Sequence, residues 1–168
     1  MDDKKWFVIR TNPRAEKQVS LRLLDIGIEH YLPLHRQIRQ WKDRKKYVEV
    51  PLFSSYVFVR TTEKLRREVF KVSGIVRYLF VGGQIATISE KEIERIKIFC
   101  TLADVKIEEQ SFEIGEEVEV ISGELIGLRG QLTSSTTGHK LKINISALGY
   151  FATINIDKND VKRVETEA

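Results

Sequence analysis

The segment Leu52-Phe53-Ser54-Ser55-Tyr56-Val57-Phe58-Val59 reads as a polar turn followed by a run of aromatic and β-branched residues. Such residues favour a strand, and the two serines favour the turn before it. Alternate side chains of a strand share a face, so Tyr56 and Phe58 are expected on the same face of a sheet. If helices cover only the other face, these rings are open to a partner; the alternative is that Phe58 is an ordinary core residue.

Upstream, Trp6–Arg10 is a second predicted strand, because it is also aromatic and β-branched. Asn12 followed by Pro13 predicts the start of a helix, since proline's missing N–H has no partner to lose there. Gly27 predicts its end. The apolar positions of this helix recur at helical spacing: Ala15, Val19, Leu23 and Ile26. Its other face carries a polar and basic row: Arg14, Gln18 and Arg22, with Lys17 beside them.

Four further strands and two further helices complete the predicted first domain. Ser89 and Glu92 form a capping-box pattern at the start of the last helix, flanked by Ile88 and Ile93. The order of elements predicts an α+β, ferredoxin-like fold with helices on one face of the sheet. The predicted segments are strands at 29–34, 38–41, 46–50 and 75–80, a helix capped by Thr62, a Gly82-Gly83 turn, and a final helix burying Ile93, Ile96 and Cys100.

The hydrophobic period is lost after Thr101, and from Phe112 the pattern is purely β, with short strands between glycine-containing turns. A small closed, SH3-like β-barrel accounts for that pattern. The predicted organisation is an N-terminal domain over 1–102, a charged linker over 103–111 and a barrel domain over 112–168.

The composition excludes several classes of protein. Of 168 residues, 42% are hydrophobic and 31% are charged, which argues against wholesale disorder. No window approaches the roughly 20 apolar residues of a membrane span, and the stretch Met1–Trp6 lacks an apolar signal region. The single cysteine, Cys100, excludes an internal disulfide and fits a reducing compartment. A cytoplasmic monomer without membrane contact is expected.

The net charge of +4 is distributed unevenly along the chain. Residues 1–60 carry 13 basic and 7 acidic side chains, whereas residues 114–168 carry 6 basic and 8 acidic ones. The strongest basic run is Lys42-Asp43-Arg44-Lys45-Lys46, at the tip of a predicted hairpin. This asymmetry predicts that the first domain faces a polyanion and the second does not. A solvated, uneven surface is the simpler alternative.

The sequence offers little catalytic chemistry. His30 and His35 fall on opposite faces of a predicted strand, which is not a metal-ligand spacing, and His139 stands alone. Cys100 lies on the apolar face of a helix, where an inert thiol is expected. Phosphate-binding, dinucleotide and nucleophile motifs are all missing from the chain. We therefore expect no enzyme activity, no metal site and no cofactor.

Several motifs together resemble one family. The segments Lys5-Trp6-Phe7-Val8, Phe53-x-x-Tyr56-Val57-Phe58-Val59 and Gly74–Leu79 resemble the N-terminal (NGN) domain of NusG-type transcription factors, as does the helix start Ile88-Ser89-x-Lys91-Glu92-Ile93. The stretch Val118–Leu132, with glycines at 123, 127 and 130, resembles a KOW module. The general factor usually has Pro-Gly where this chain has Ser54-Ser55. In this respect the chain resembles RfaH and the UpxY-like antiterminators of polysaccharide operons.

The resemblance implies a function in transcription. A member of this family binds the β′ clamp helices of RNA polymerase, reaches toward the β subunit, contacts the non-template DNA strand, and promotes processive elongation and antitermination. Carried over by position, the polymerase contacts would be Phe53, Tyr56, Phe58, Val81, Ile93 and Ile96, with Arg66 and Arg67 toward the β subunit. Operon-specific relatives carry small polar residues at that last site, so Arg66 and Arg67 are a departure and could contact DNA instead.

Two further surfaces follow from the same resemblance. The DNA-binding residues would be Asn12, Arg14, Lys17, Gln18 and Arg22 on the helix and Lys42, Arg44 and Lys45 in the hairpin. The KOW module would bind a protein, either a small-subunit ribosomal protein or the terminator Rho, through Leu125 and Leu128, although both leucines equally fit a barrel core. Two alternatives remain: a general NusG-type elongation factor, and a KOW-type ribosome-associated RNA-binding protein, which the acidic barrel disfavours.

Overall fold

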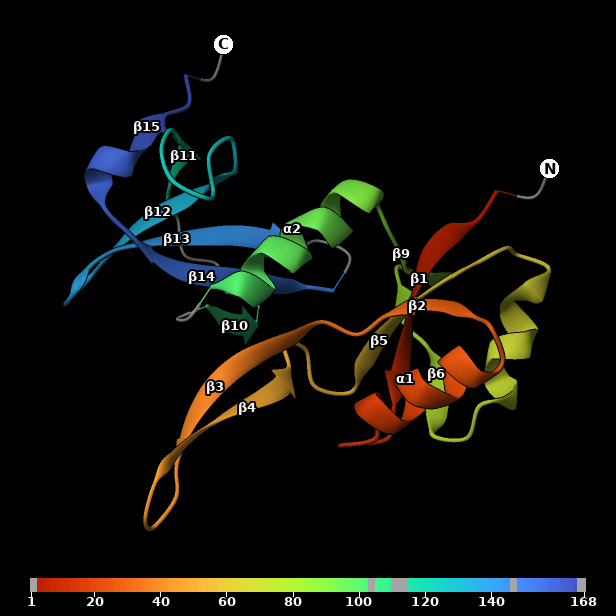
Figure 1. The fold of residues 1–168 in the computed structure, drawn as a ribbon. Helices are drawn as coiled ribbons and strands as arrows, with labels where there is room; N and C mark the ends of the chain where they lie inside the picture. The colour runs from red at the N-terminus through yellow and green to blue at the C-terminus, as the bar shows by residue number, and fades with distance from the viewer. Residues whose placement is uncertain (1–2, 103–104, 110–114, 146–147, 166–168) are drawn as a thin grey trace. The chain divides into compact units, whose positions relative to one another are not determined.

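The computed structural model describes residues 3–102, 105–109, 115–145 and 148–165 (Figure 1). The chain divides into two compact units, Met1–Ala103 and Asp104–Ala168, called unit 1 and unit 2 below. Both units are built mostly from strands, and the described α-helices both belong to unit 1.

Unit 1 is organised around a central strand, β1 (Lys5–Thr11). On one side it pairs antiparallel with β5 (Tyr56–Thr61), and β2 (Glu29–Tyr31) continues the sheet beyond β5. On the other side it pairs with β6 (Ile75–Tyr78) and β9 (Thr87–Ile88). These pairings confirm the predicted strands at the start of the chain and after Ser55.

One face of this sheet packs on α1 (Glu16–Asp25) and on η1, a 3₁₀-helix (Leu65–Lys71). Alternation along β1 and β5 places their odd-numbered apolar residues on this face, and the register sets Phe7 opposite Val59. The buried cluster consists of Phe7, Ile9, Val19, Leu23, Val57, Val59, Val69, Val72 and Tyr78. The apolar stripe predicted for the first helix is therefore a core stripe.

The opposite face, which carries Trp6 and Phe58, is covered by α2 (Glu90–Thr101). The indole N–H of Trp6 donates to a carboxylate oxygen of the first residue of α2 at 2.8 Å. Near the other end of α2, Cys100 Sγ lies 3.6 Å from the Tyr31 hydroxyl, and the Tyr31 ring stacks on Phe58 with centroids 6.3 Å apart. Helices therefore lie on both faces of the sheet, and the expectation of a single covered face is wrong.

The predicted capping box at Ser89 is confirmed: its hydroxyl accepts the Glu92 N–H, and the Glu92 carboxylate accepts the Ser89 N–H. The predicted start of the first helix is wrong. Helix α1 begins at Glu16 after Ala15, without a side-chain cap. The Asn12 N–H instead donates to Gly74 O at 2.9 Å, and Arg14 adopts a left-handed φ of 63° that no helical residue has.

The predicted strand at 75–80 ends at Tyr78, and Phe80 begins a separate two-stranded ribbon of β7 (Phe80–Val81) and β8 (Gln84–Ile85). The Gly82-Gly83 turn joins its strands, and both glycines have positive φ. The predicted helix after Thr62 forms as the 3₁₀-helix η1, whose first residue, Leu65, is exposed.

A long two-stranded ribbon forms a third part of unit 1. Strands β3 (Leu34–Gln40) and β4 (Lys45–Pro51) pair with each other along their whole length, as a sheet of their own. The Trp41 N–H donates to Arg44 O at 2.8 Å and closes the turn between them. The ribbon projects from the sheet of unit 1 (Figure 1), and the segment Leu34–Pro51 is called the arm below.

Unit 2 is one antiparallel sheet in the order β10-β14-β13-β12-β11-β15. Its strands are β10 (Lys106–Glu109), β11 (Glu116–Val120), β12 (Arg129–Ser135), β13 (Gly138–Ile145), β14 (Tyr150–Ile156) and β15 (Val161–Arg163), with the short 3₁₀-helix η2 (Lys158–Asp160) before the last. The predicted linker is wrong for Lys106–Glu109, because these residues pair with β14. Val105, also in the predicted linker, is buried. The remaining linker residues, 103–104 and 110–111, lie outside the described ranges. Gly130 has no room for a side chain, since a Cβ there would lie 2.4 Å from Lys142 O.

The two-sided packing of the sheet predicts unequal costs for two phenylalanine truncations. Phe58→Ala should lower the free energy of unfolding by about 3–5 kcal/mol, because it opens a cavity in a filled core. Phe80→Ala should cost under about 1 kcal/mol, since that ring is 54% exposed. Denaturant titration followed by tryptophan fluorescence measures unit 1, which holds both tryptophans. Equal losses would contradict this packing.

Candidate nucleic-acid interface

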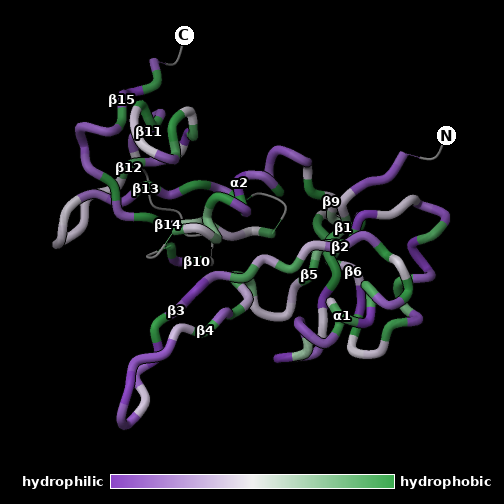
Figure 2. Tube along the Cα trace, in the orientation of Figure 1, coloured by the Kyte–Doolittle hydropathy of each residue, from purple (hydrophilic) through white to green (hydrophobic). Residues whose placement is uncertain are grey.

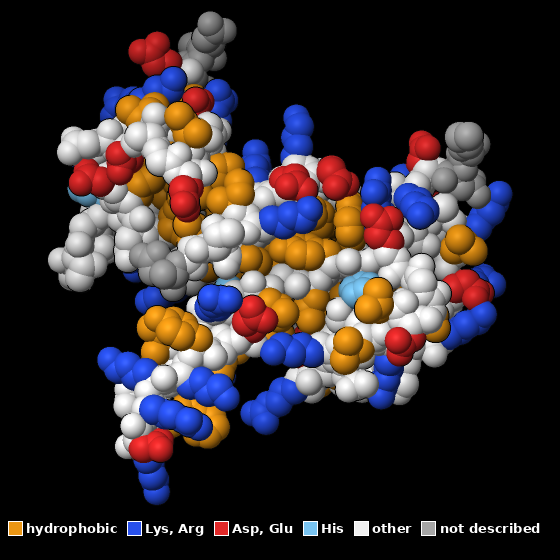
Figure 3. Space-filling view, viewed as in Figure 1, with side chains coloured by type: hydrophobic (Ala, Val, Ile, Leu, Met, Phe, Trp, Pro, Cys, Tyr) orange, Lys and Arg blue, Asp and Glu red, His pale blue; other side chains and the backbone are white. Residues whose placement is uncertain are grey.

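The arm concentrates positive charge in an exposed structure. It carries six basic side chains and two acidic ones, a surplus equal to the net charge of the entire chain. Along the outer part of the ribbon, the residues from Arg36 to Tyr47 are all exposed. Figure 2 shows this outer part as mainly hydrophilic, and Figure 3 shows Lys and Arg side chains around it with hydrophobic ones between them.

Cross-strand register gives the arm two different faces. Arg39 lies opposite Lys46, and Gln37 lies opposite Val48, so these residues share one face. Ile38 lies opposite Tyr47 on the other face. Both faces carry two basic side chains, Arg39 and Lys46 on the first and Arg36 and Lys45 on the second. The second face also carries Glu49 and two exposed apolar side chains, Ile38 and Tyr47. The first is called the basic face below and the second the apolar face.

The basic face of the arm borders a groove of about 670 Å³ that it shares with the start of α1. Three cations line this groove: Arg14 and Lys17 from the α1 side and Arg39 from β3. Two carboxylates, Glu16 and Glu49, line it as well, which leaves a surplus of one positive charge. Gln37 adds an amide, which can donate and accept hydrogen bonds. Guanidinium, ammonium and amide groups together suit phosphates and the edges of bases. This cavity is called the basic groove below.

Two hydrogen bonds hold the walls of the basic groove together. The Lys17 ammonium donates to Glu49 O at 2.7 Å, which ties α1 to β4. The Ser55 N–H donates to Glu16 Oε1 at 2.7 Å, which ties α1 to the turn that follows the arm. Glu16 is buried although it is charged. Ser55 has a left-handed φ of 66°, so this bond helps to hold a backbone conformation that a serine disfavours.

The apolar face of the arm borders a second groove, of about 760 Å³, shared with the C-terminal end of α2. Its apolar lining comes from both elements: Leu34, Ile38, Tyr47, Cys100 and Leu102. Arg36 and Glu49, also in the lining, form an exposed ion pair at 3.9 Å. This cavity is called the apolar groove below.

The structure brings together only part of the predicted DNA-binding set. Arg14 and Lys17 line the basic groove, and Lys42, Arg44 and Lys45 are exposed at the turn of the arm. Gln37, Arg39 and Trp41 are not among the residues predicted from the sequence, although the density of basic residues from 36 to 46 is a usable signal.

The remaining three predicted DNA-binding residues lie outside the basic groove and differ in their exposure. Asn12 and Gln18 are exposed but do not line the basic groove. Arg22 is half-buried, and its guanidinium donates to Ser73 O at 2.7 Å. Arg22 therefore anchors α1 to the turn before β6. The predicted row of Arg14, Gln18 and Arg22 is broken, because Arg14 precedes the helix.

Most of the predicted polymerase contacts are buried. Phe53, Phe58, Ile93 and Ile96 are each at most 3% exposed, and the Phe53 ring packs edge-on against Phe58 at 6.2 Å. The prediction of an open aromatic patch is therefore wrong for these four residues. Sequence alternation correctly placed the rings on one face but carried no information on α2, which covers it. Of the same set, Tyr56 is half-buried and Val81 is exposed.

Arg66 and Arg67 lie on η1 beside a cleft of about 570 Å³. The Arg66 guanidinium pairs with Glu63 at 2.7 Å and lies 5.7 Å from the centroid of the Phe7 ring. Arg66 is therefore engaged within unit 1, whereas Arg67 is exposed. Lys64, Arg77, Phe70 and Phe80 also line this cleft.

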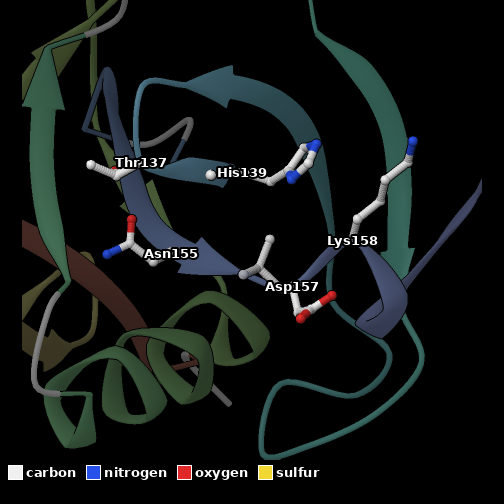
Figure 4. A pocket seen from close by; sticks show the side chains of 7 residues that line it. Thr137, His139, Asn155, Asp157 and Lys158 are labelled. Carbon is white, nitrogen blue, oxygen red and sulfur yellow. The ribbon is translucent and has the colours of Figure 1, made fainter.

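In unit 2, Leu128 is buried and Leu125 is half-buried. The prediction of Leu128 as an exposed contact is therefore wrong. The neighbouring Ile126 is 66% exposed. A cavity of about 470 Å³ lies between the start of β13 and the end of β14, where Thr137, His139, Asn155, Asp157 and Lys158 are labelled in Figure 4. Asp157 accepts the Asn159 N–H at 2.9 Å, so its carboxylate serves a local turn.

Some titratable groups in unit 1 have structural partners, whereas the buried Nδ1 of His35 has no hydrogen-bond partner among the described residues. His30 bonds to Ser20 Oγ and Ile28 O at 2.8 and 3.0 Å, and burial lowers the pKa of His35. Burial also raises the pKa of Tyr31 and of Cys100, whose thiol is half-buried. Across the described ranges, His, Cys, Asp and Glu side chains form no group of three able to hold a metal ion.

An α+β unit with a projecting basic arm is followed in the sequence by a small antiparallel β unit, and the arm carries the charge typical of a nucleic-acid-binding surface. The family model "NusG: Transcription termination factor nusG" matches residues 4–97, more than half of the chain, and the protein therefore belongs to the NusG family. It is 24% identical over 174 residues to the transcription termination/antitermination protein NusG of Rickettsia bellii, covering 96% of this chain and 91% of that one.

A solved structure of Thermotoga maritima NusG matches 97% of this chain and 98% of its own, at 21% identity and a TM-score of 0.57. This likeness supports the fold, an NGN domain followed by a KOW domain. The chain is accordingly a transcription termination/antitermination factor of the NusG family, which works with RNA polymerase and is not an enzyme. None of the helices in the described ranges is long and apolar enough to span a membrane.

The basic groove predicts a specific salt effect. Arg39→Gln should weaken binding of the protein to single-stranded DNA and reduce the slope of log affinity against log salt by about 0.7, the value for one lost phosphate contact. Lys91→Gln, at an exposed lysine of α2, is the matched control and should leave the slope unchanged. Fluorescence anisotropy at several salt concentrations measures both. An unchanged slope for Arg39→Gln would place the bound strand elsewhere.

Proposed function

We propose that this protein binds RNA polymerase and the exposed non-template DNA strand and suppresses pausing and termination on a restricted set of operons. The observation that carries the proposal is the arm, whose basic groove and apolar groove open on its two faces. A factor that must contact DNA and a protein at once needs two such surfaces close together. It acts in the cytoplasm, beside the polymerase.

The apolar groove is the proposed polymerase contact. Exposed apolar side chains at a concave surface favour a protein partner, and the groove is bounded by a strand ribbon and a helix end. A helical element such as the β′ clamp helices fits beside Ile38 and Tyr47. Tyr56 and Val81 remain as proposed additional contacts, and Arg67 as the proposed contact toward the β subunit.

The basic groove and the turn of the arm are the proposed DNA contact. Arg14, Lys17 and Arg39 would bind phosphates, while the Gln37 amide could read a base edge. Asn12 and Gln18 stay in the proposal as exposed polar residues near α1. The charge of Lys42, Arg44 and Lys45 adds attraction that does not depend on sequence and weakens with salt.

The Ser54-Ser55 pair supports an operon-specific role. Ser55 occupies a left-handed conformation, which glycine adopts at no steric cost and which suits the Pro-Gly of general factors. This chain instead holds the turn with the Glu16 carboxylate. The second candidate is a general elongation factor; family membership and 24% identity are compatible with either.

Unit 2 is proposed to bind a protein, either a small-subunit ribosomal protein or Rho. The chain from 114 to 168 carries more acidic than basic residues, which disfavours an RNA partner. Ile126, with Leu125 beside it, offers an exposed apolar contact in the loop before β12.

Transcription in vitro tests the proposed function. Templates carry a terminator behind either the leader of the gene cluster adjoining the coding sequence or an unrelated leader. The protein should increase read-through on the first template and leave the second nearly unchanged. Equal read-through on both would make it a general factor. Read-through that does not increase on either template would contradict the antitermination proposal.

The apolar groove predicts a second outcome. Ile38→Ala should weaken binding of the protein to the polymerase about tenfold, because a central apolar contact is lost from the interface. Leu24→Ala removes a similarly exposed aliphatic side chain from α1 and should bind like the parent. Surface plasmon resonance with immobilised polymerase measures both. Parent-like binding by Ile38→Ala would remove this groove from the interface.

A further inference from the structure

Trp41 is an unusual residue for an exposed turn. It is 51% exposed at the end of β3, although a large aromatic ring is usually at least partly covered in a soluble protein. The Lys46 ammonium lies 5.8 Å from the centroid of its indole ring. This contact places the Trp41 ring on the basic face of the arm, where Lys46 lies opposite Arg39.

The backbone holds Trp41 in place. Its N–H donates to Arg44 O at 2.8 Å, and its carbonyl accepts the Gln40 side-chain amide at 3.2 Å. The ring is therefore presented from a closed turn, and little conformational entropy is lost when a ligand packs on it.

The charges around the Trp41 ring indicate which class of ligand it binds. Four basic residues follow Trp41 in the sequence, Lys42, Arg44, Lys45 and Lys46, with Asp43 as the one acid in that run. All five side chains are exposed. An aromatic face among several cations is the combination that binds single-stranded nucleic acid, where phosphates meet the cations and a base stacks on the ring. A duplex keeps its bases stacked inside and offers the ring no base face.

We propose that Trp41 is a stacking platform for one unpaired base of a single-stranded nucleic acid whose backbone follows the basic face of the arm. This inference rests on the proposed function and deepens it, since it names the chemistry recognised at the turn: an unpaired base together with its flanking phosphates. The basic groove binds the next part of the same strand, because Arg39 lies between Trp41 and the groove on the same face.

The test compares three oligonucleotides of equal length on the full chain: a single strand, the same strand with abasic sites at every position, and a duplex. DNA and RNA versions of the single strand distinguish the two sources of unpaired bases. The parent should bind the base-bearing strand at least about tenfold more tightly than the abasic strand, the typical effect of one stacked base. Tryptophan emission should fall on binding, because a stacked base quenches the ring.

Two variants separate stacking from charge. Trp41→Ala should lose the preference for bases and keep the affinity for the abasic strand, because the cations remain. Trp41→Phe should retain most of the preference, since a phenyl ring also stacks, and its remaining emission comes from the buried Trp6 and should not respond to the strand. Trp41→Phe also keeps the test decisive if Trp41→Ala does not fold.

Three outcomes would overturn the proposal. Equal binding of base-bearing and abasic strands by the parent, with unchanged emission, would mean that the arm acts through charge alone, and the proposed function would stand. Loss of polymerase binding by Trp41→Ala with unchanged strand affinity would assign the ring to a protein contact. If the parent binds none of the strands at low salt, the proposed DNA contact fails together with the stacking platform.

Discussion

The hydrogen bond from the Ser55 N–H to the buried Glu16 carboxylate lies where three parts of unit 1 meet. Glu16 is the first residue of α1, and Ser55 is the last residue before β5. The arm ends just before that turn, at Pro51. Because β5 pairs with β1 along its length, this bond relates the arm and the first turn of α1 to the sheet. The basic groove depends on this bond, because the bond keeps the start of α1 beside the end of the arm.

Helices on both faces of the sheet leave the arm as the part of unit 1 that we propose for recognition. With α1 and η1 on one face and α2 on the other, Phe58 of β5 is buried in the core, whereas Tyr56 of the same strand is half-buried. The arm has no such covering layer. Along its outer part, from Arg36 to Tyr47, basic and apolar side chains remain exposed. Arg39 and Lys46 lie on one face, and Ile38 and Tyr47 lie on the other, together with Arg36 and Lys45.

Local patterns in the sequence were sufficient for much of the fold. The capping box at Ser89 needs only residues three apart, and the strand after Ser55 is marked by its own composition, so both were predicted correctly. The start of α1 was not, because Arg14 has a left-handed φ of 63° and the helix begins only at Glu16. The Asn12 N–H donates to Gly74 O, 62 positions away, a contact that has no local signal in the sequence. The strand in the predicted linker was also missed, since its partner β14 is distant in sequence.

The candidate site, like the fold, could be predicted where the signal is local in sequence and not where the contact is between distant residues. Composition identified the basic run at the tip of the arm, but the meeting of Arg39 with Arg14 across the basic groove is non-local and has no sequence signal. Family resemblance placed Phe58 in an interface, whereas packing against Tyr31 places it in the core.

The central claim is that a nucleic-acid strand lies in the basic groove, and NMR tests it most directly. On titration with single-stranded DNA, we predict amide shift changes in residues 14–18 and 36–47, and few in unit 2. Changes confined to unit 2, or spread evenly over unit 1, would contradict the claim.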